Sequence, residues 1–539
     1  MRKIKPQLIS LLSFILILAI GLRLYGINWD NGVHLHPDER MLIMVADRIN
    51  FFENLNPHFF NYGSLPIYLL KGLTQLIDFF FITSIATYDG MLIVGRLLSV
   101  TADVLTIFFI FKISQTLFKR EVSLLAAFIY AIAFFPIQNS HFFVVDVFLN
   151  LFITILVYQL LIYCKKPTLI RVILIGVNMA AALSTKATSL IFIPFVLTVL
   201  LVTFFQKKIK FKQFIFHFFI FNFLFLIFYF IFMPYAFLEL PIFIRDVKLQ
   251  MEMNNNAYIF PYTLQYVGTL PYLYYLKNIF LWGLGPIISI ISFVGLASLL
   301  YQKRRPNFLF FIFYFLYFLI IGRSSVKFMR YMLPLYPFFA ILAGYGLYKL
   351  YKLYKPLGYI SVILVLFWLF MFVNIYSYKH TRIAATDWIL KNISPGASIA
   401  TEHWDDTLPL REGENYKHIE LTLYDQPDDE KKWLVLNEKL KQADYIIIAS
   451  NRLYVPLQKL KNCGQYKICY PNAAEYYKKL FNEQLGFKKV AEFTNYPGLE
   501  TVPPLAGWKL EINDDSADES FTVYDHPKIM IFKKNGKEN

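Results

Sequence analysis

The sequence is poor in charge and in cysteine. Only 17% of its 539 residues are charged, whereas 57% are hydrophobic and 19% are aromatic. That balance is too apolar for a water-soluble chain of this length. The three cysteines exclude a disulfide-rich scaffold, and the sequence has no CxxC pair, no HExxH and no glycine-rich phosphate-binding loop. No internal repeat is visible. What remains is a membrane protein without a common metal or nucleotide motif.

Charge divides the chain into two parts. Residues 1–378 contain 31 Lys and Arg against 13 Asp and Glu, whereas residues 379–539 contain 22 against 24. The net charge of +16 therefore belongs to the apolar part. It predicts how the chain lies in a membrane, with membrane lipids as neighbours, and no nucleic-acid partner.

Apolar runs of about 20 residues, the length that crosses a bilayer, predict an α-helical polytopic membrane domain over 1–378. Basic clusters at alternate connections place the amino terminus in the cytosol and the tail outside the plasma membrane. The stretch 65–87 is apolar as well, but Lys71 and Asp78 favour an interfacial or re-entrant segment. The larger outer loops are 28–65 and 235–277. Eleven spans are expected near 7–27, 92–117, 122–138, 143–163, 169–185, 187–205, 213–234, 278–301, 307–322, 331–349 and 357–377.

The tail 379–539 reads as a soluble α/β domain. Helices are expected at 384–392 and 474–484, and strands at 398–401, 445–449 and 528–532. The run Glu402-His403-Trp404-Asp405-Asp406 suits contact with a sugar or a peptide, although such a strand-to-loop segment is more often only a packed turn. Cys463 and Cys469 form either a short disulfide loop in an oxidising compartment or two free thiols.

The first outer loop contains His36-Pro37-Asp38-Glu39, which places two carboxylates at the mouth of the bundle. Apolar residues at helical spacing predict a short amphipathic helix near 41–52. Pro37 favours the first helical turn, so Asp38 and Glu39 would lie at the positive end of its dipole. They either carry chemistry, as acids near hydrocarbon commonly do, or only complement the dipole.

Asp146 lies at the outer end of the fourth predicted span, among apolar neighbours. A buried charge there requires a basic side chain, a metal ion or a hydroxyl-bearing substrate as its partner. If the partner is a divalent metal ion, His36 and His141 would complete its site together with Asp38, Glu39 and Asp146.

Three cations, Arg323, Lys327 and Arg330, lie at the outer ends of the ninth and tenth spans, against the inside bias of positive charge. Guanidinium groups fork onto phosphate oxygens, so a phosphate headgroup fits them. General attraction to anionic lipids is the alternative. Lys186 is either a further phosphate contact or a side chain that reaches the interface. Arg96 and Asp103, seven residues apart, are interpreted as a structural pair that neutralises itself.

Four segments together resemble the bacterial GT-C glycosyltransferases that are similar to protein O-mannosyltransferases and aminoarabinose transferases. The resemblance covers most of 1–378, and each motif alone is short and weak. The segments are His36-Pro37-Asp38-Glu39, Gly95-Arg96-Leu97-Leu98-Ser99, His141-Phe142-Phe143-Val144-Val145-Asp146 and Arg330-Tyr331-Met332-Leu333-Pro334-Leu335-Tyr336-Pro337.

The resemblance implies transfer of a sugar, a hexose or pentose, from a polyprenyl-phosphate carrier to an acceptor hydroxyl on a protein, lipid or glycan. It implies Asp38 as the base, with Glu39 beside it and Asp146 as a second acid. One departure stands out, since the aminoarabinose transferases have a phosphate-binding Lys-Pro-Pro run where this chain has Tyr62-Gly63-Ser64-Leu65-Pro66. The phosphate contact then comes from elsewhere, or the donor differs.

Two other functions fit a chain of this kind. A transporter or flippase of a lipid-linked sugar would also need many spans and outward cations, but its repeat symmetry and broken spans are not evident in the sequence. A glycan ligase or polymerase of the same fold would use the same acids on another donor.

Overall fold

The computed structural model describes residues 6–301, 308–410, 416–500 and 509–536. The chain divides into two compact units. One, called here the membrane unit, comprises Met1–Asn28, His36–Met251 and Leu270–Phe370. The other, the C-terminal unit, comprises Trp29–Leu35, Glu252–Thr269 and Met371–Asn539. Two short segments of the first 270 residues thus belong with the tail.

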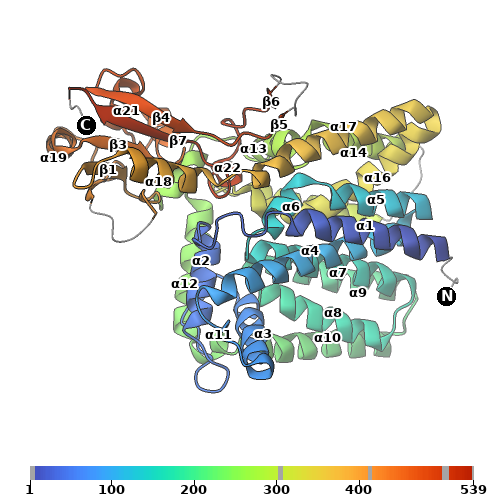
Figure 1. The fold of residues 1–539 in the computed structure, drawn as a ribbon. Helices are drawn as coiled ribbons and strands as arrows, with labels where there is room; N and C mark the ends of the chain where they lie inside the picture. Colours follow the sequence, from blue (N-terminus) through green and yellow to red (C-terminus); the bar gives the residue numbers. More distant parts are fainter. Residues whose placement is uncertain (1–5, 302–307, 411–415, 501–508, 537–539) are drawn as a thin grey trace. The chain divides into compact units, whose positions relative to one another are not determined.

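The regular secondary structure of the membrane unit is helical over the described residues, apart from one isolated bridge between Asn50 and Asn54, and its helices are drawn in Figure 1. Their bounds are α1 Pro6–Leu24, α2 Pro37–Asp47, α3 Leu65–Phe81, α4 Gly90–Leu117, α5 Arg120–Ala131, α6 Phe134–Ser140, α7 Val145–Lys165, α8 Leu169–Leu183, η1 Ala187–Phe192, α9 Ile193–Phe205, α10 Phe211–Phe232, α11 Tyr235–Leu238, α12 Leu240–Asn255, α13 Leu273–Asn278, η3 Ile279–Gly283, α14 Gly285–Tyr301, α15 Phe308–Gly322, η4 Met329–Leu335, α16 Tyr336–Leu353 and α17 Lys355–Val373.

Six helices in the described residues are long and apolar enough to cross a membrane, or up to eight if each of two bent pairs is one span. Shorter apolar helices occupy Ser10–Leu24, Leu169–Leu183 and Phe310–Gly322, where further spans were predicted. The chain is an integral membrane protein, and the number eleven stays a prediction. The six are Gly90–Leu117, Val145–Lys165, Ala187–Phe205, Phe211–Phe232, Met329–Leu353 and Lys355–Asn392.

The two bent pairs were not foreseen from the sequence. Arg120–Ala131 and Phe134–Ser140 meet at 56°, and Leu273–Gly283 and Gly285–Tyr301 meet at 116°. Gly285 has a φ of +77°, and a Cβ there would lie 2.5 Å from the Trp368 indole nitrogen. Only glycine fits such a corner without strain.

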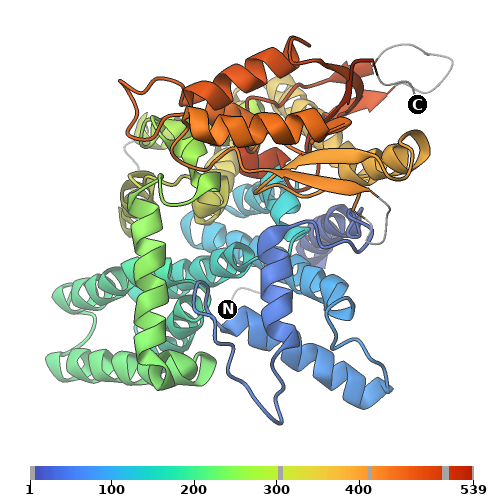
Figure 2. The same cartoon turned by 90° about the vertical axis from the view of Figure 1, so that its left-hand side faces the viewer.

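Two helices run across one end of the long helices, as both views show (Figures 1 and 2). They are α2 and α12. The helix α2 begins at Pro37, after the cap residue His36, and places Asp38 and Glu39 in its first turn, as predicted. It ends at Asp47, earlier than expected, and buries Leu42 and Val45 on its apolar face.

The C-terminal unit is built on a five-stranded mixed sheet of order β2-β1-β3-β7-β4. Strand β1 is parallel to β2 and β3, whereas β7 is antiparallel to β3 and β4. A cluster that includes Ile399, Ile447 and Ile531 forms its apolar core. The elements are η2 Pro261–Tyr266, η5 Asn374–Ser377, α18 Thr381–Asn392, β1 Ser398–Glu402, β2 Lys417–Leu421, α19 Glu430–Gln442, β3 Tyr445–Ile448, α20 Tyr454–Lys459, α21 Pro471–Phe481, β4 Phe487–Phe493, β5 Gly498–Glu500, β6 Lys509–Glu511, α22 Glu519–Thr522 and β7 Ile529–Lys534.

This sheet confirms the predicted α/β tail. The three expected strands correspond to β1, β3 and β7, and the two expected helices to α18 and α21. The two earlier segments of the unit are held by defined contacts. The rings of Trp29 and His380 lie 5.5 Å apart, and Lys459 Nζ donates to the carbonyl oxygen of Gln265 at 3.2 Å. Gln265 also donates to the carboxylate of Glu519.

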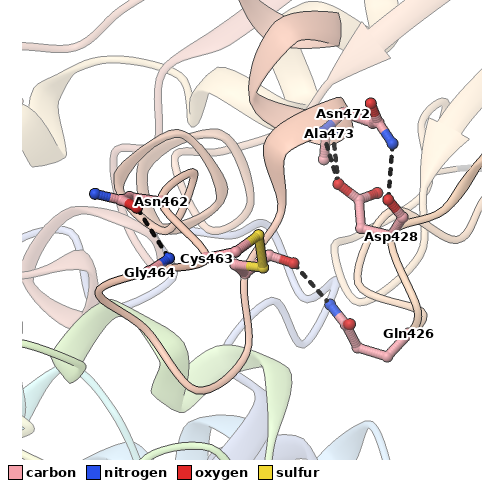
Figure 3. The surroundings of a disulfide bond; sticks show 8 residues. Gln426, Asp428, Asn462, Cys463, Gly464, Asn472 and Ala473 are labelled. Atoms are coloured by element: carbon pink, nitrogen blue, oxygen red, sulfur yellow. Dashed lines mark hydrogen bonds between the residues drawn. A yellow bond between two sulfur atoms is a disulfide. The ribbon is translucent and has the colours of Figure 1, made fainter.

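Cys463 and Cys469 form a disulfide, which decides between the two alternatives left open by the sequence (Figure 3). Gln426 Nε2 donates to the carbonyl oxygen of Cys469 at 3.2 Å. Nearby, Asp428 accepts hydrogen bonds from the backbone amides of Asn472 and Ala473. The loop is therefore bound to the segment before α19, and that segment is bound in turn to the start of α21.

Candidate active site

Two of the predicted acids and two of the predicted cations meet at one end of the membrane unit. Arg330 Nη2 lies 2.8 Å from Asp38 Oδ2, and Arg330 Nε lies 3.6 Å from Asp146 Oδ2. Lys186 Nζ donates to Asp146 Oδ1 at 2.7 Å. Of the partners considered for the buried Asp146, the structure therefore shows basic side chains. The four residues form one chain of charge in the order Asp38, Arg330, Asp146, Lys186.

Local structure explains why these charges converge. Asp38 lies in the first turn of α2 and Asp146 in the first turn of α7, where the positive end of a helix dipole favours a carboxylate. Arg330 lies in η4, and Lys186 immediately precedes η1. Short helices thus carry the cations, and helix starts carry the acids.

Exposure differs along this chain of charge. The side chain of Asp38 is 22% exposed, whereas that of Asp146 is 3% exposed. Those of Arg330 and Lys186 are 10% and 12% exposed. Asp38 is therefore the carboxylate that an incoming molecule reaches most easily.

Each cation also lies over an aromatic ring, a feature that the sequence analysis missed. The Lys186 ammonium lies 4.5 Å from the centre of the Tyr331 ring, and the Arg330 guanidinium 4.5 Å from that of Phe328. The two rings pack edge to face at 5.6 Å. Cation–π attraction of this kind orients a charge and grows as water is excluded. The signal in the sequence was the aromatic residue next to Arg330.

The turn that carries Lys186 is bonded to the first outer loop. The amide of Gly63 donates to Thr185 O and that of Leu65 to Ser184 O, both at 3.0 Å. A Cβ on Gly63 would lie 2.0 Å from Ser184 O, so only glycine permits this approach. The segment Tyr62-Gly63-Ser64-Leu65-Pro66, which stands where the aminoarabinose transferases have Lys-Pro-Pro, therefore binds the turn that contains Lys186. A lysine from another part of the chain is thus brought beside this segment.

Tyr62 stands beside this contact. Burial, followed by the charge of Asp38, raises the pKa of the Tyr62 hydroxyl well above its usual range. The group consequently stays protonated and can donate a hydrogen bond. Tyr62 is a polar neighbour of the acids that the sequence analysis did not single out.

Glu39 is placed differently from Asp38, although the two are adjacent. Arg96 Nη2 donates to Glu39 Oε2 at 2.7 Å, Arg96 Nε donates to Oε1 at 3.0 Å, and the Phe143 amide donates to Oε1 at 2.9 Å. Both side chains are fully buried. The geometry gives Glu39 a structural task, since its two oxygens already accept three hydrogen bonds.

The predicted pairing of Arg96 with Asp103 is wrong. Asp103 is bound by Arg23 at 2.6 Å and accepts a hydrogen bond from Tyr130 at 2.7 Å. Seven residues along a helix span about 10 Å, so each charge on α4 finds a nearer partner on another element. Two buried pairs replace one.

The histidines are engaged in local structure. His36 Nδ1 accepts from the Glu39 amide at 3.4 Å, and its ring packs on Phe142 at 4.6 Å. Both ring nitrogens of His141 lie 2.8 Å from carbonyl oxygens, those of Ile137 and Tyr25. Within the described ranges no three His, Cys, Asp or Glu side chains are grouped to hold a metal ion. The acids and histidines named for a metal site are thus not gathered into one.

The other two cations do not join the ion pairs of Asp38 and Asp146 described above. Lys327 is buried and donates to Ser325 O at 3.0 Å. Arg323 is exposed, just after α15. Of the four predicted phosphate ligands, Arg330 and Lys186 therefore lie beside the acids.

The chain and its fold have counterparts among known proteins. The family model for dolichyl-phosphate-mannose-protein mannosyltransferases matches residues 78–233. No curated protein matches the chain by sequence. The fold is that of the GT-C glycosyltransferases, which confirms the resemblance stated from the motifs.

Several solved structures are similar to this chain in fold. The Archaeoglobus fulgidus oligosaccharyltransferase tethered with an acceptor peptide is 14% identical, with a TM-score of 0.51, over 87% of this chain and 72% of that one. AglB from the same organism, in complex with an inhibitory peptide and a dolichol-phosphate, is 13% identical with the same coverage and TM-score. ArnT from Cupriavidus metallidurans, bound to undecaprenyl phosphate, is 11% identical over 96% and 98%, with a TM-score of 0.48, which is too low to support a common fold by itself.

Proposed function

We propose that this protein is an inverting glycosyltransferase that moves a sugar from a polyprenyl-phosphate carrier to an acceptor hydroxyl at the outer face of the plasma membrane. The observation that carries the proposal is the convergence of Asp38 and Asp146 with Arg330 and Lys186. The dolichol-phosphate in the AglB complex is a carrier of the same chemistry. The acceptor is a hydroxyl of a protein, lipid or glycan.

The proposed reaction requires a base and a site for a leaving phosphate. Asp38 takes the proton of the acceptor hydroxyl, whose oxygen attacks the anomeric carbon from the face opposite the phosphate. The bond from that carbon to the phosphate oxygen breaks, and polyprenyl phosphate leaves with the electron pair. Arg330 and Lys186 stabilise the developing negative charge, so that no general acid is required. One displacement inverts the anomeric centre.

The outer location rests on two features. Basic clusters lie on the connections predicted to be cytosolic, and the disulfide of the C-terminal unit suits an oxidising compartment. With the amino terminus in the cytosol, the tail and the acids face outward together.

A transferase that moves a whole glycan is the second candidate, favoured by the similarity of fold to an oligosaccharyltransferase. The same acids would serve, and only the donor would be larger. A transporter of a lipid-linked sugar would leave the bond between sugar and phosphate intact.

The test is release of polyprenyl phosphate from a radiolabelled lipid-linked sugar by the purified protein in nanodiscs, with and without an envelope extract as acceptor. Acceptor-dependent release that Asp38→Asn abolishes supports the proposal. Movement of the lipid-linked sugar between leaflets without cleavage would contradict it. Comparison of surface glycans between a strain with the gene and one without it identifies the sugar and the acceptor.

A further inference from the structure

Arg330 is shared between the two acids. Its Nη2 bonds Asp38 Oδ2 at 2.8 Å while its Nε faces Asp146 Oδ2 at 3.6 Å. In this arrangement, Asp38 presents to Arg330 an oxygen that the acceptor hydroxyl would otherwise use. Proton transfer to that oxygen requires Arg330 to move away first.

The cations that hold the acids are also the groups best suited to a phosphate. Two carboxylates and two cations leave this cluster without net charge. A phosphate that enters brings negative charge and competes with the carboxylates for the guanidinium fork. Asp146 keeps Lys186 at 2.7 Å when Arg330 turns away, whereas Asp38 has Arg330 as its ion-pair partner.

We propose that Arg330 exchanges partners when the donor binds, passing from Asp38 to the donor phosphate, so that the base is released only with the donor in place. The inference rests on the proposed function. It orders the reaction, since the acceptor hydroxyl meets a competent base only after the carrier phosphate has arrived.

Phe328 is the positioning residue of this exchange. Its ring lies 4.5 Å from the Arg330 guanidinium and offers attraction that does not depend on which anion the fork faces. The guanidinium is therefore held on its ring face while its donor edge changes partner.

The exchange is testable by a double-mutant cycle on Asp38 and Arg330. The proteins are wild type, Asp38→Asn, Arg330→Gln and the double variant, each in phosphatidylcholine nanodiscs, which exclude anionic lipid. Farnesyl phosphate is the probe and farnesol the phosphate-free control, with Kd measured by calorimetry. Thermal unfolding verifies that each variant is folded.

The expected result is a tighter Kd for farnesyl phosphate in Asp38→Asn, by about tenfold if Arg330 is otherwise available in roughly a tenth of the molecules. In the Arg330→Gln background the same substitution should change the Kd far less, because no exchange remains. Equal tightening in both backgrounds would show simple repulsion by Asp38, and no tightening in either would show that Arg330 is not shared. Either result overturns the exchange and leaves the proposed function standing.

Two controls and one further variant distinguish a failure of the partner exchange from a failure of the proposed function. Asp246→Asn removes a carboxylate from the Arg245–Asp246 pair on α12 and should leave the Kd unchanged. Equal binding of farnesol and farnesyl phosphate by the wild type would overturn the proposed function together with the exchange. Phe328→Leu should weaken phosphate binding and also reduce the effect of Asp38→Asn, whereas a purely structural Phe328 would change neither.

Discussion

Glu39 and Arg96 form an ion pair in which both side chains are withdrawn completely from solvent, with Arg96 Nη2 and Glu39 Oε2 2.7 Å apart. The pair joins the first turn of α2 to the start of α4. It fixes the position of the first turn of α2 and therefore of Asp38, the residue that precedes Glu39.

Breaking this pair should damage the fold rather than the reaction. Glu39→Gln removes the charge of the carboxylate that pairs with the buried Arg96 guanidinium, and breaking a buried ion pair costs about 3–5 kcal/mol. We expect a clear fall in Tm for Glu39→Gln and for Arg96→Gln, while Asp38→Asn unfolds near the wild-type temperature. A Glu39→Gln protein of full stability that had lost only activity would instead show that Glu39 takes part in the chemistry.

Asp38→Asn should abolish transfer while the protein stays folded and still binds the donor. The amide keeps the shape of the side chain and removes its basicity, and general-base catalysis contributes about 10²–10⁴-fold in rate. The measurement is single-turnover cleavage of the lipid-linked donor. Retention of most activity would move the base elsewhere, with Asp146 as the next residue to test.

The ring of Tyr331 should matter more than its hydroxyl. Tyr331→Leu removes the aromatic face under Lys186, an attraction of about 0.5–2 kcal/mol, whereas Tyr331→Phe keeps it. We expect a several-fold higher KM for the donor in the leucine variant and a smaller change in the phenylalanine variant. Identical effects of the two substitutions would assign the role to the hydroxyl.

The C-terminal unit should lose stability as the pH rises from about 4.5 to 8. Burial raises the pKa of Glu402 to about 8, whereas an exposed glutamate titrates near 4.5. Between these values the folded state binds more protons than the unfolded state, so unfolding becomes easier as the pH rises. Comparison of Tm against pH for the wild type and Glu402→Gln isolates this contribution, because the glutamine variant should show a flatter profile.

The predicted topology can be tested through the tail. In a variant without the three native cysteines, a single cysteine at Asn462 should react with a membrane-impermeant maleimide added to intact cells. A cysteine at Lys207, in a predicted cytosolic connection, should react only after permeabilisation. Reversed labelling would invert the orientation and place the acids on the cytosolic side.

The sequence predicted the helical membrane part, the α/β tail and the helix start at Pro37, because each depends on local patterns of apolar and capping residues. It also singled out Asp38, Asp146, Lys186 and Arg330, because charges near hydrocarbon are rare. What it did not resolve were their partners. Arg96 pairs with Glu39, 57 positions away, and such pairing depends on how helices pack. The close approach of Trp368 to Gly285 at the bend likewise depends on helix packing.

The C-terminal unit is built from three separate segments of the chain, and His36 directly follows the first of them. The tail alone therefore cannot be exchanged as an independent domain. A hybrid made by joining another tail at residue 371 would carry mismatched residues 29–35 and 252–269, and the first mismatch would lie three residues before Asp38. Changes in the tail that alter its contacts with these two segments therefore require matching changes far upstream in the chain.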